Sequence, residues 1–140
     1  MILNTIAKWA NWFRRWVTGE ESLIRSLNRW RVQSDLRNRR TIVRGYPYEA
    51  YIDICNYCNL QCPLCPTGQG RKERQKGMMS LDTFEIIMNQ IGKYLYTVRL
   101  DSWGEPLLNK EIFQIIRCAA GYGIKVSFST NLNVLGDEEA

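Results

Sequence analysis

The stretch Ile52-Asp-Ile-Cys-Asn-Tyr-Cys-Asn-Leu-Gln-Cys-Pro-Leu-Cys-Pro66 decides how this chain is interpreted, because it holds four of the five cysteines. Cys58, Cys62 and Cys65 form a C-x3-C-x2-C pattern, so three thiolates can converge on one inorganic centre. Three is one fewer than the four ligands of a fully ligated iron–sulfur cluster. A cubane cluster held at three irons would keep its fourth iron open for a substrate or a cofactor.

Zinc is the main alternative for these cysteines. A zinc ribbon separates its two C-x2-C pairs by about 15–20 residues, whereas Cys55-x2-Cys58 and Cys62-x2-Cys65 are separated by three residues. The chain also departs from the C-x2-C-x2-C-x3-C-P order of bacterial ferredoxins. Five cysteines in 140 residues, without a recognisable secretory signal, do not indicate a disulfide framework. We expect Cys55 to be a small, partly buried strand residue and Cys118 to be structural.

Two further motifs follow the cysteines. They are Asp101-Ser-Trp-Gly-Glu-Pro-Leu-Leu108 and Phe128-Ser-Thr-Asn-Leu132. In order and spacing, the three motifs resemble the N-terminal half of the core of the radical S-adenosylmethionine (radical SAM) superfamily, over roughly residues 46–135.

The resemblance implies a set of cofactors and ligands. Cys58, Cys62 and Cys65 would hold a 4Fe–4S cluster, and its open iron would bind the amino and carboxylate groups of S-adenosylmethionine. Further cofactor contacts are implied at Leu64, Gly104, Glu105, Pro106, Ser129 and Asn131. In the family, the reduced cluster cleaves S-adenosylmethionine, and the resulting 5′-deoxyadenosyl radical abstracts hydrogen from the substrate. The reductant would be a flavodoxin- or ferredoxin-like protein. No catalytic residue is assigned.

Composition narrows the chemistry and divides the chain. Histidine is absent, which excludes Ser-His-Asp and Cys-His catalysis within this chain. Residues 1–45 carry ten Lys and Arg against three acidic residues, whereas residues 46–140 carry nine against eleven. We therefore predict a basic N-terminal segment, 1–45, and a separate core domain, 46–140. The overall composition is typical of a cytoplasmic protein.

The N-terminal segment has helical periodicity. Apolar residues recur at helical spacing at Ile2, Ile6, Trp9, Phe13 and Trp16. A second basic helix is predicted from Glu20 to about Arg40, with Leu23, Leu27 and Trp30 along one side. Packing on the core domain is the ordinary role of such a stripe, although aromatic and basic faces are also typical of helices at a membrane surface. Nucleic-acid binding is less favoured, because a basic patch alone gives only non-specific affinity.

The core domain reads as alternating strands and helices. Strands are predicted at 48–54, 96–101 and 124–130, and helices after Ser80 and over 109–120, with Gly121 near the end of the second helix. This order implies right-handed crossovers and a parallel sheet. Each strand alternates apolar and polar residues, as in Ile124-Lys-Val-Ser-Phe128. One face should therefore meet helices and the other should line a wet lumen, with the three motifs at the carboxyl ends of the strands.

We therefore predict an α/β fold, a partial (β/α) barrel of radical SAM type with its first three β/α units, preceded by the basic helical segment. With about three of the six units of the family core, the chain is expected to be the N-terminal part of a longer enzyme, incomplete for turnover by itself. The sequence does not identify the substrate, although its motifs are similar to those of radical SAM family members that modify peptides. A non-catalytic iron–sulfur or zinc module, and a basic interaction or membrane-surface protein, stay open as alternatives.

Overall fold

The computed structural model describes residues 13, 17, 22–70 and 75–134. Contacts divide the chain into two compact units, Met1–Tyr48 and Glu49–Ala140. The predicted first helix lies outside the described residues except for Phe13, which is helical and exposed, as is Val17. Among the helices of the described residues, none is long and apolar enough to cross a membrane.

The first unit contains helix α2 (Leu23–Arg37). The helix begins where the Ser22 hydroxyl accepts a hydrogen bond from the Arg25 N–H at 3.2 Å, an N-cap that satisfies an orphan donor. It ends where Arg39 takes a left-handed conformation, with φ of 49°. The helix is thus shorter than the predicted range of 20–40, because a cap and a left-handed residue stop it.

The polar side of α2 binds the segment that follows the helix. The Asn28 side chain exchanges two hydrogen bonds with the backbone of Tyr46, at 2.7 and 2.9 Å. Buried Asp35 accepts the Arg44 backbone N–H at 2.8 Å and the guanidinium Nη2 at 2.7 Å. Hydrogen bonding from Arg44 lowers the pKa of Asp35 below its ordinary value. The predicted apolar side is exposed, at Leu23, Leu27 and Trp30.

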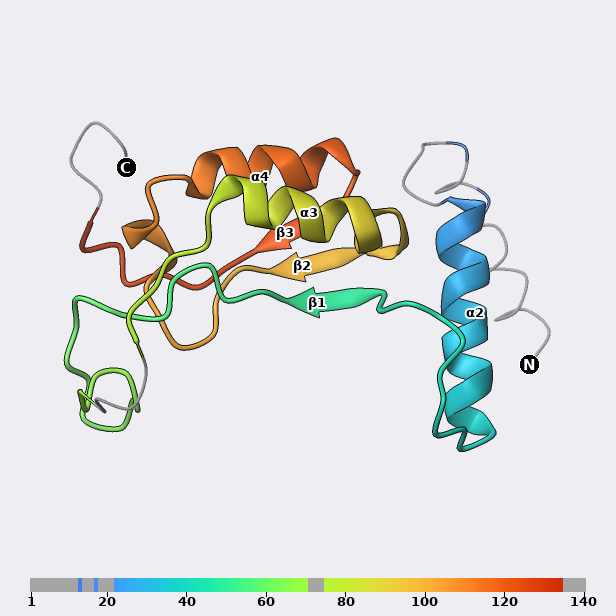
Figure 1. The fold of residues 1–140 in the computed structure, drawn as a ribbon, viewed down its shortest axis with the longest axis horizontal. Coiled ribbons are helices and arrows are strands. Elements are labelled where there is room, and N and C mark those ends of the chain that lie inside the picture. The colour runs from blue at the N-terminus through green and yellow to red at the C-terminus, as the bar shows by residue number, and fades with distance from the viewer. Residues whose placement is uncertain (1–12, 14–16, 18–21, 71–74, 135–140) are drawn as a thin grey trace. The chain divides into compact units, whose positions relative to one another are not determined.

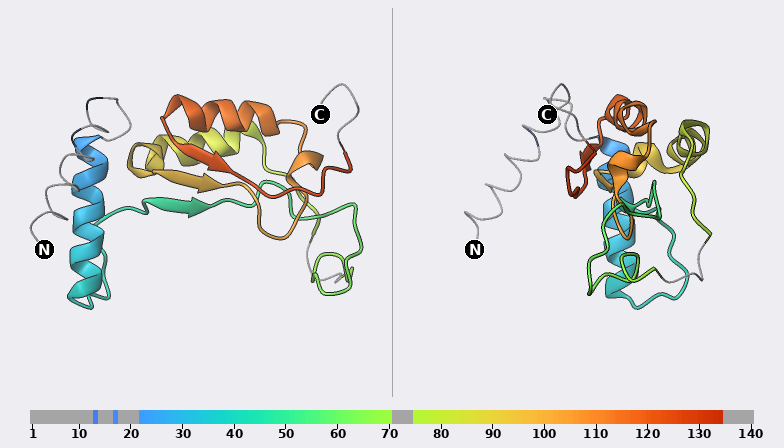
Figure 2. Two further views of the ribbon diagram at one scale, coloured as in Figure 1. Left: turned by 180° about the vertical axis from the view of Figure 1, so that it is seen from behind. Right: turned by 90° about the vertical axis from the view of Figure 1, so that its left-hand side faces the viewer.

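The second unit is a three-stranded parallel sheet with two helices on one face (Figure 1). The strands β1 (Glu49–Tyr51), β2 (Thr97–Arg99) and β3 (Lys125–Ser127) lie in the order β1-β2-β3. Helix α3 (Leu81–Ile91) connects the first two strands and helix α4 (Ile112–Gly121) the last two. Both views in Figure 2 place α3 and α4 on the same side of the sheet. The predicted strand–helix alternation is confirmed.

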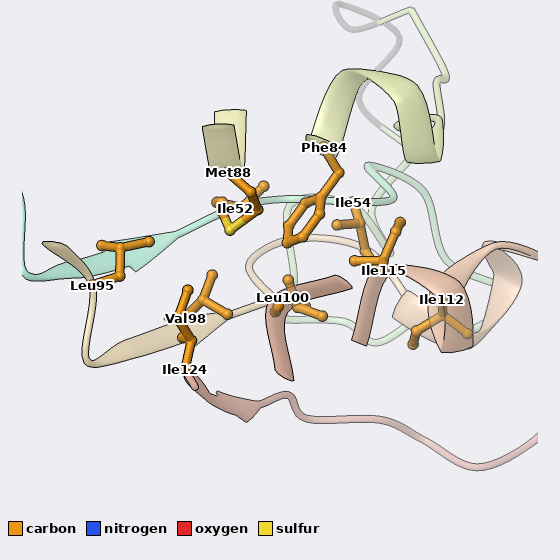
Figure 3. Close-up of a cluster of buried hydrophobic side chains, with 11 residues drawn as sticks. Ile52, Ile54, Phe84, Met88, Leu95, Val98, Leu100, Ile112, Ile115 and Ile124 are labelled. Atoms are coloured by element: carbon orange, nitrogen blue, oxygen red, sulfur yellow. The ribbon is translucent and has the colours of Figure 1, made fainter. Parts of the chain in front are cut away.

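The core lies between this sheet face and the two helices (Figure 3). The predicted apolar stripes are confirmed, since the apolar residues that alternate along the strands and the inward positions of both helices are buried or half-buried in one cluster. The largest of these buried side chains are Phe84, Ile54, Met88, Leu95, Leu100, Ile112 and Ile115. The Ser80 hydroxyl caps α3 by accepting the Thr83 N–H at 3.3 Å, as predicted.

Several element boundaries differ from the sequence prediction. The strands, each of three residues, are shorter than the predicted ranges 48–54, 96–101 and 124–130. Helix α4 begins at Ile112 and not at Asn109, because Pro106–Leu108 form a short 3-10 helix, η2, and Asn109 ends it with an extended backbone. The predicted place of Gly121 near the end of this helix is confirmed, because Gly121 is the last residue of α4. The turn that follows is made at Gly123, with φ of 67°. Glycine suits that position because it adopts positive φ without strain.

The other face of the sheet is polar and is not covered by α3 or α4. A hollow of about 240 Å³ on this face is lined by Glu49, Ala50, Tyr51, Thr97, Arg99, Lys125 and Ser127. Arg99 binds Asp101 through two hydrogen bonds, at 2.8 and 3.1 Å, and its guanidinium lies 5.4 Å from the centre of the Tyr51 ring. A sheet that is apolar on one face and polar on the other matches the predicted alternation.

Candidate cofactor site

The loops that follow the three strands gather at one end of the sheet (Figures 1 and 2). Parallel strands bring their carboxyl ends to one edge, which is where β/α folds assemble functional groups. The cysteine loop follows β1, the Trp-Gly-Glu-Pro turn follows β2, and the Thr-Asn segment follows β3. The structure thus brings the three predicted motifs together.

The base of the cysteine loop is closed by backbone and side-chain hydrogen bonds. The side-chain oxygen of Asn56 accepts a hydrogen bond from the Gly77 N–H at 2.8 Å. The side-chain amide nitrogen of Asn56 donates to the Gln75 carbonyl at 3.0 Å. Cys55 and Met78 form an antiparallel bridge directly below. The loop therefore leaves and rejoins the domain at one fixed point.

Within the loop, the chain folds tightly around Cys62 and Cys65. The Cys65 N–H donates to the Cys62 carbonyl at 3.1 Å, and the Gln69 N–H donates to the Cys65 carbonyl at 2.9 Å. A Cβ added to Gly68 would lie 2.5 Å from the Cys62 nitrogen and 2.7 Å from its oxygen. Gly68 is required because only a residue without Cβ permits this approach.

The three predicted ligands differ in exposure and in the donors that face their sulfurs. Cys62 is exposed, while Cys58 and Cys65 are half-buried. Cys58 Sγ accepts the Leu60 N–H at 3.4 Å and the Asn131 side-chain amide at 3.5 Å. The backbone N–H groups of Gly68 and Thr67, and then the Thr67 hydroxyl, lower the pKa of the Cys65 thiol.

Hydrogen bonds from N–H groups to a cysteine sulfur stabilise the thiolate, which is the form that binds a metal or an iron–sulfur cluster. The donor set of three cysteines and the tight turn at Gly68 therefore fit an iron–sulfur cluster. Among the described residues, no three Cys, Asp or Glu side chains already stand close enough to hold one metal ion. Closing the triad would require the loop to move its thiols toward one another.

The hydrogen bonds to Cys65 predict an order of thiol reactivity in the cluster-free chain. The pKa of Cys65 lies below the ordinary value of 9.0, whereas burial raises the pKa of Cys118. Because the thiolate is the nucleophile, alkylation of Cys65 should reach half its maximal rate below pH 9.0 and that of Cys118 above it. Peptide mass spectrometry after timed iodoacetamide exposure at several pH values measures both rates.

Thr67→Val is the matched variant for this experiment, because it removes the hydroxyl donor and keeps the backbone donors. It should move the Cys65 profile upward, toward pH 9.0, and should leave Cys118 unchanged. An identical pH profile for the two thiols in the parent chain would contradict the role of the loop amides.

The two remaining cysteines take the structural roles predicted for them. Cys55 is 2% exposed, and its thiol donates to the Tyr57 carbonyl at 3.3 Å. Burial raises the pKa of this thiol. Cys118 lies on α4, half-buried against the core.

Gly104 lies directly against the cysteine loop. A Cβ on Gly104 would overlap the Cys55 carbonyl oxygen and would lie 2.6 Å from its carbon and 2.9 Å from the Tyr57 carbonyl oxygen. The adjacent Glu105 N–H donates to the same Tyr57 oxygen at 2.9 Å. Gly104, predicted as a cofactor contact, therefore packs closely against the backbone of the chain's own cysteine loop.

Glu105 joins the second and third motifs. Its carboxylate is buried, with 2% of the residue exposed. One oxygen accepts the Thr130 hydroxyl at 2.6 Å and the Leu107 N–H at 3.0 Å, and the other accepts the Asn131 N–H at 2.8 Å. Buried carboxylates need such donors. The following Pro106 is buried and begins η2.

The other predicted cofactor contacts lie in the loops at the carboxyl end of the sheet. Ser129 is exposed, and its hydrogen bonds help the Arg99 guanidinium to lower the pKa of Asp101. Leu64, at the tip of the cysteine loop, is 95% exposed. The Asn131 side-chain amide contacts both Cys58 and Asn59. Of the predicted set, Gly104, Glu105 and Asn131 are therefore brought against the cysteine loop.

Asn109 is a site residue that sequence reasoning missed. It is 2% exposed, and its side-chain amide donates to the carbonyls of Ile54 and Met79, both at 2.9 Å. Its side-chain oxygen accepts the Glu111 N–H at 2.9 Å. These bonds hold together the segment that enters the cysteine loop, at Ile54, and the segment that leaves it, at Met79. An asparagine in the turn between η2 and α4 was the available signal, since such residues often bond backbone groups.

Comparisons with known proteins agree with this arrangement. No protein-family model matches the chain. The chain is 29% identical over 90 residues to the tungsten-containing aldehyde ferredoxin oxidoreductase cofactor-modifying protein of Pyrococcus furiosus, covering 63% of the chain and 25% of the relative. It is 24% identical over 94 residues to the PqqA peptide cyclase of Rhodopseudomonas palustris, covering 67% of the chain and 25% of the relative. The chain therefore spans about a quarter of the length of the curated relatives it matches.

A solved structure shares the fold. The crystal structure of BtrN in complex with AdoMet and 2-DOIA superposes with a TM-score of 0.59 at 20% identity, over 68% of this chain and 40% of that one. The second unit is thus an α/β domain with a parallel sheet, similar to part of the BtrN fold. AdoMet, which that crystal structure contains, is S-adenosylmethionine, and the two curated relatives are named a cofactor-modifying protein and a peptide cyclase. The predicted resemblance to the radical SAM superfamily is confirmed.

Proposed function

We propose that this chain forms the part of a radical SAM enzyme that binds a 4Fe–4S cluster and S-adenosylmethionine, built as the first three units of a partial (β/α) barrel. One observation carries the proposal. The three-cysteine loop, the Gly104-Glu105 turn and the Thr-Asn segment are joined by direct contacts at the carboxyl edge of one parallel sheet. The radical SAM relatives support the general class.

Each group of residues has its own role in this proposal. Cys58, Cys62 and Cys65 would hold the cluster, with the amides around Cys65 stabilising a thiolate. When bound, the reduced cluster supplies the electron that cleaves S-adenosylmethionine and so generates a 5′-deoxyadenosyl radical for hydrogen abstraction. Gly104 lets the turn approach the cysteine loop, and the polar face of the sheet lies beside this edge to receive a polar substrate.

The substrate and the partners are proposed on narrower grounds. A peptide substrate is supported by the name of one curated relative, a peptide cyclase. The electron would come from a flavodoxin- or ferredoxin-like reductant, as in the family that the chain resembles. The basic segment 1–45, with its excess of Lys and Arg, would supply affinity for an anionic membrane surface.

Anaerobic reconstitution with iron and sulfide tests the proposal. The dithionite-reduced chain should give the electron paramagnetic resonance (EPR) signal of a 4Fe–4S cluster, and S-adenosylmethionine should change that signal by binding to the open iron. Cys58→Ala removes one of three ligands and should reduce cluster content at least about tenfold, the scale on which altering a metal site lowers affinity. Cys118→Ala is the matched control and should retain the full signal.

A non-catalytic iron–sulfur or zinc module is the competing interpretation, favoured by the solvent exposure of Cys62. Stoichiometric zinc without a cluster would replace the radical SAM proposal by this reading. A cluster whose signal ignores S-adenosylmethionine would reassign the site to electron storage or transfer.

A further inference from the structure

The end of the third strand reaches back to the first ligand of the cysteine loop. The Asn131 side-chain amide lies 3.5 Å from Cys58 Sγ and 2.9 Å from the Asn59 side-chain oxygen. The two partners lie 73 and 72 positions away in the sequence. One amide group therefore connects the loop after β1 with the segment after β3.

The backbone of this segment is fixed by Glu105. Its carboxylate accepts the Asn131 N–H at 2.8 Å and the Thr130 hydroxyl at 2.6 Å. The same carboxylate is 2% exposed and also accepts the Leu107 N–H, so it is anchored on its own turn. A ligand ammonium would compete with these three donors for the two oxygens. The geometry fits a residue that positions its neighbour.

We propose that Asn131 is a positioning residue that holds Cys58 and withdraws electron density from its sulfur, and that Glu105 acts through Asn131. The inference rests on the proposed function, because it assigns a role toward a cluster held by Cys58. Hydrogen bonds to ligand sulfurs are among the factors that set cluster reduction potentials. A donor favours the reduced form, which carries the additional negative charge, and thereby raises the potential.

The test is a redox titration of the reconstituted full chain, followed by EPR. Asn131→Leu removes the donor at nearly constant size, and the midpoint potential of the cluster should shift to a more negative value. Asn131→Asp keeps the shape of the side chain but replaces the donor by an acceptor, so it should shift the potential further in the same direction. Thermal unfolding of each cluster-free variant separates this role from a loss of folding.

Asn133→Leu is the matched control. Asn133 is an exposed neighbour, and the hydrogen bond that ties it to Asn131 is made by its backbone N–H, which the substitution keeps. The midpoint potential of this variant should equal that of the parent chain. A shift as large as that of Asn131→Leu would overturn the assignment to Asn131.

Glu105→Gln tests the claim that this carboxylate acts through Asn131. In this variant an NH2 group replaces one carboxylate oxygen and faces an N–H or hydroxyl donor, so one of the bonds that fix the Thr130–Asn131 segment is lost. The midpoint potential should therefore shift in the same direction as in Asn131→Leu. Effects of residues that act through one another are not additive. The double variant should therefore show the potential of Asn131→Leu alone, and additive shifts would overturn the coupling.

The outcomes separate the two proposals. A parent chain that binds no cluster refutes the proposed function and this inference with it. A parent chain with a cluster, whose potential is unchanged in both Asn131 variants, refutes the inference alone. Loss of the cluster in both Asn131 variants with unchanged thermal unfolding supports the holding role. The same loss with a lowered unfolding temperature indicates a structural residue and overturns the inference.

Discussion

Gly104→Ala is expected to release the cysteine loop from the rest of the domain. The added methyl group would overlap the Cys55 carbonyl oxygen and crowd the Tyr57 carbonyl, and both are backbone atoms that cannot rotate away. Overpacking of this kind costs typically about 1–3 kcal/mol and occasionally more. We expect about 3 kcal/mol, because the shift must separate the Glu105 N–H from Tyr57 as well.

Two measurements check this result. Urea denaturation followed by circular dichroism gives the free energy of unfolding, and limited tryptic digestion reports opening of the loop at Lys76. Gly121→Ala is the matched control, because nothing lies within 4 Å of its added Cβ and its backbone is helical. That variant should gain up to about 1 kcal/mol, since glycine within a helix is less stable than alanine. Equal stabilities of the two variants would show that Gly104 is not packed as described.

The strand faces and the meeting of the three motifs could be read from the sequence. Alternation such as that of Ile124-Lys-Val-Ser-Phe128 reports burial directly, because side chains on a strand point to opposite faces. Parallel connectivity then places the ends of all strands at one edge. The short-range signals of the Ser80 cap and the apolar helix stripes were sufficient for the same reason, since each depends on residues only a few positions apart.

The contacts within the site could not be read in the same way. Gly104 against Cys55, Asn131 against Cys58 and Asn109 against Ile54 each join residues that are far apart in sequence. Nothing in the local pattern of an asparagine indicates which distant carbonyl or sulfur it will meet. Even Glu105, which its motif assigned to the site, has partners that depend on the position of the segment after the third strand.

Helix α2 illustrates the same limit in the first unit. Its apolar residues suggested the buried side, yet the side with buried residues is the polar one, with Asn28 and Asp35 bonded to the returning chain. Hydrophobic periodicity locates a helix but does not reveal which polar residues will find partners. Specific hydrogen bonds, each worth about 0.5–1.5 kcal/mol, decide that question.

Asn109→Asp is expected to have the second large effect, although it changes neither size nor shape. The Asn109 amide is the donor that both the Ile54 and Met79 carbonyls accept. A carboxylate has no donor, so the part-buried Met79 carbonyl and the buried Ile54 carbonyl, which keeps only the Met79 N–H at 3.0 Å, would both face a negative charge. Leaving a buried group unsatisfied costs about 1–3 kcal/mol, and we expect a total loss of about 3 kcal/mol near neutral pH.

The pH dependence of this variant distinguishes a lost donor from a general disturbance. The carbonyl oxygens favour the protonated carboxyl, which can donate one hydrogen bond, so the folded state raises the pKa of the introduced group. The folded state then binds the extra proton, and the deficit relative to the parent chain should shrink as the pH falls toward the ordinary carboxyl range. Asn89→Asp is the matched control, because Asn89 uses its side-chain oxygen to accept the Tyr122 hydroxyl at 2.7 Å, a role that a carboxylate keeps. Its free energy of unfolding should stay within about 0.5 kcal/mol of the parent chain, and an equal loss in both variants would contradict the donor role of Asn109.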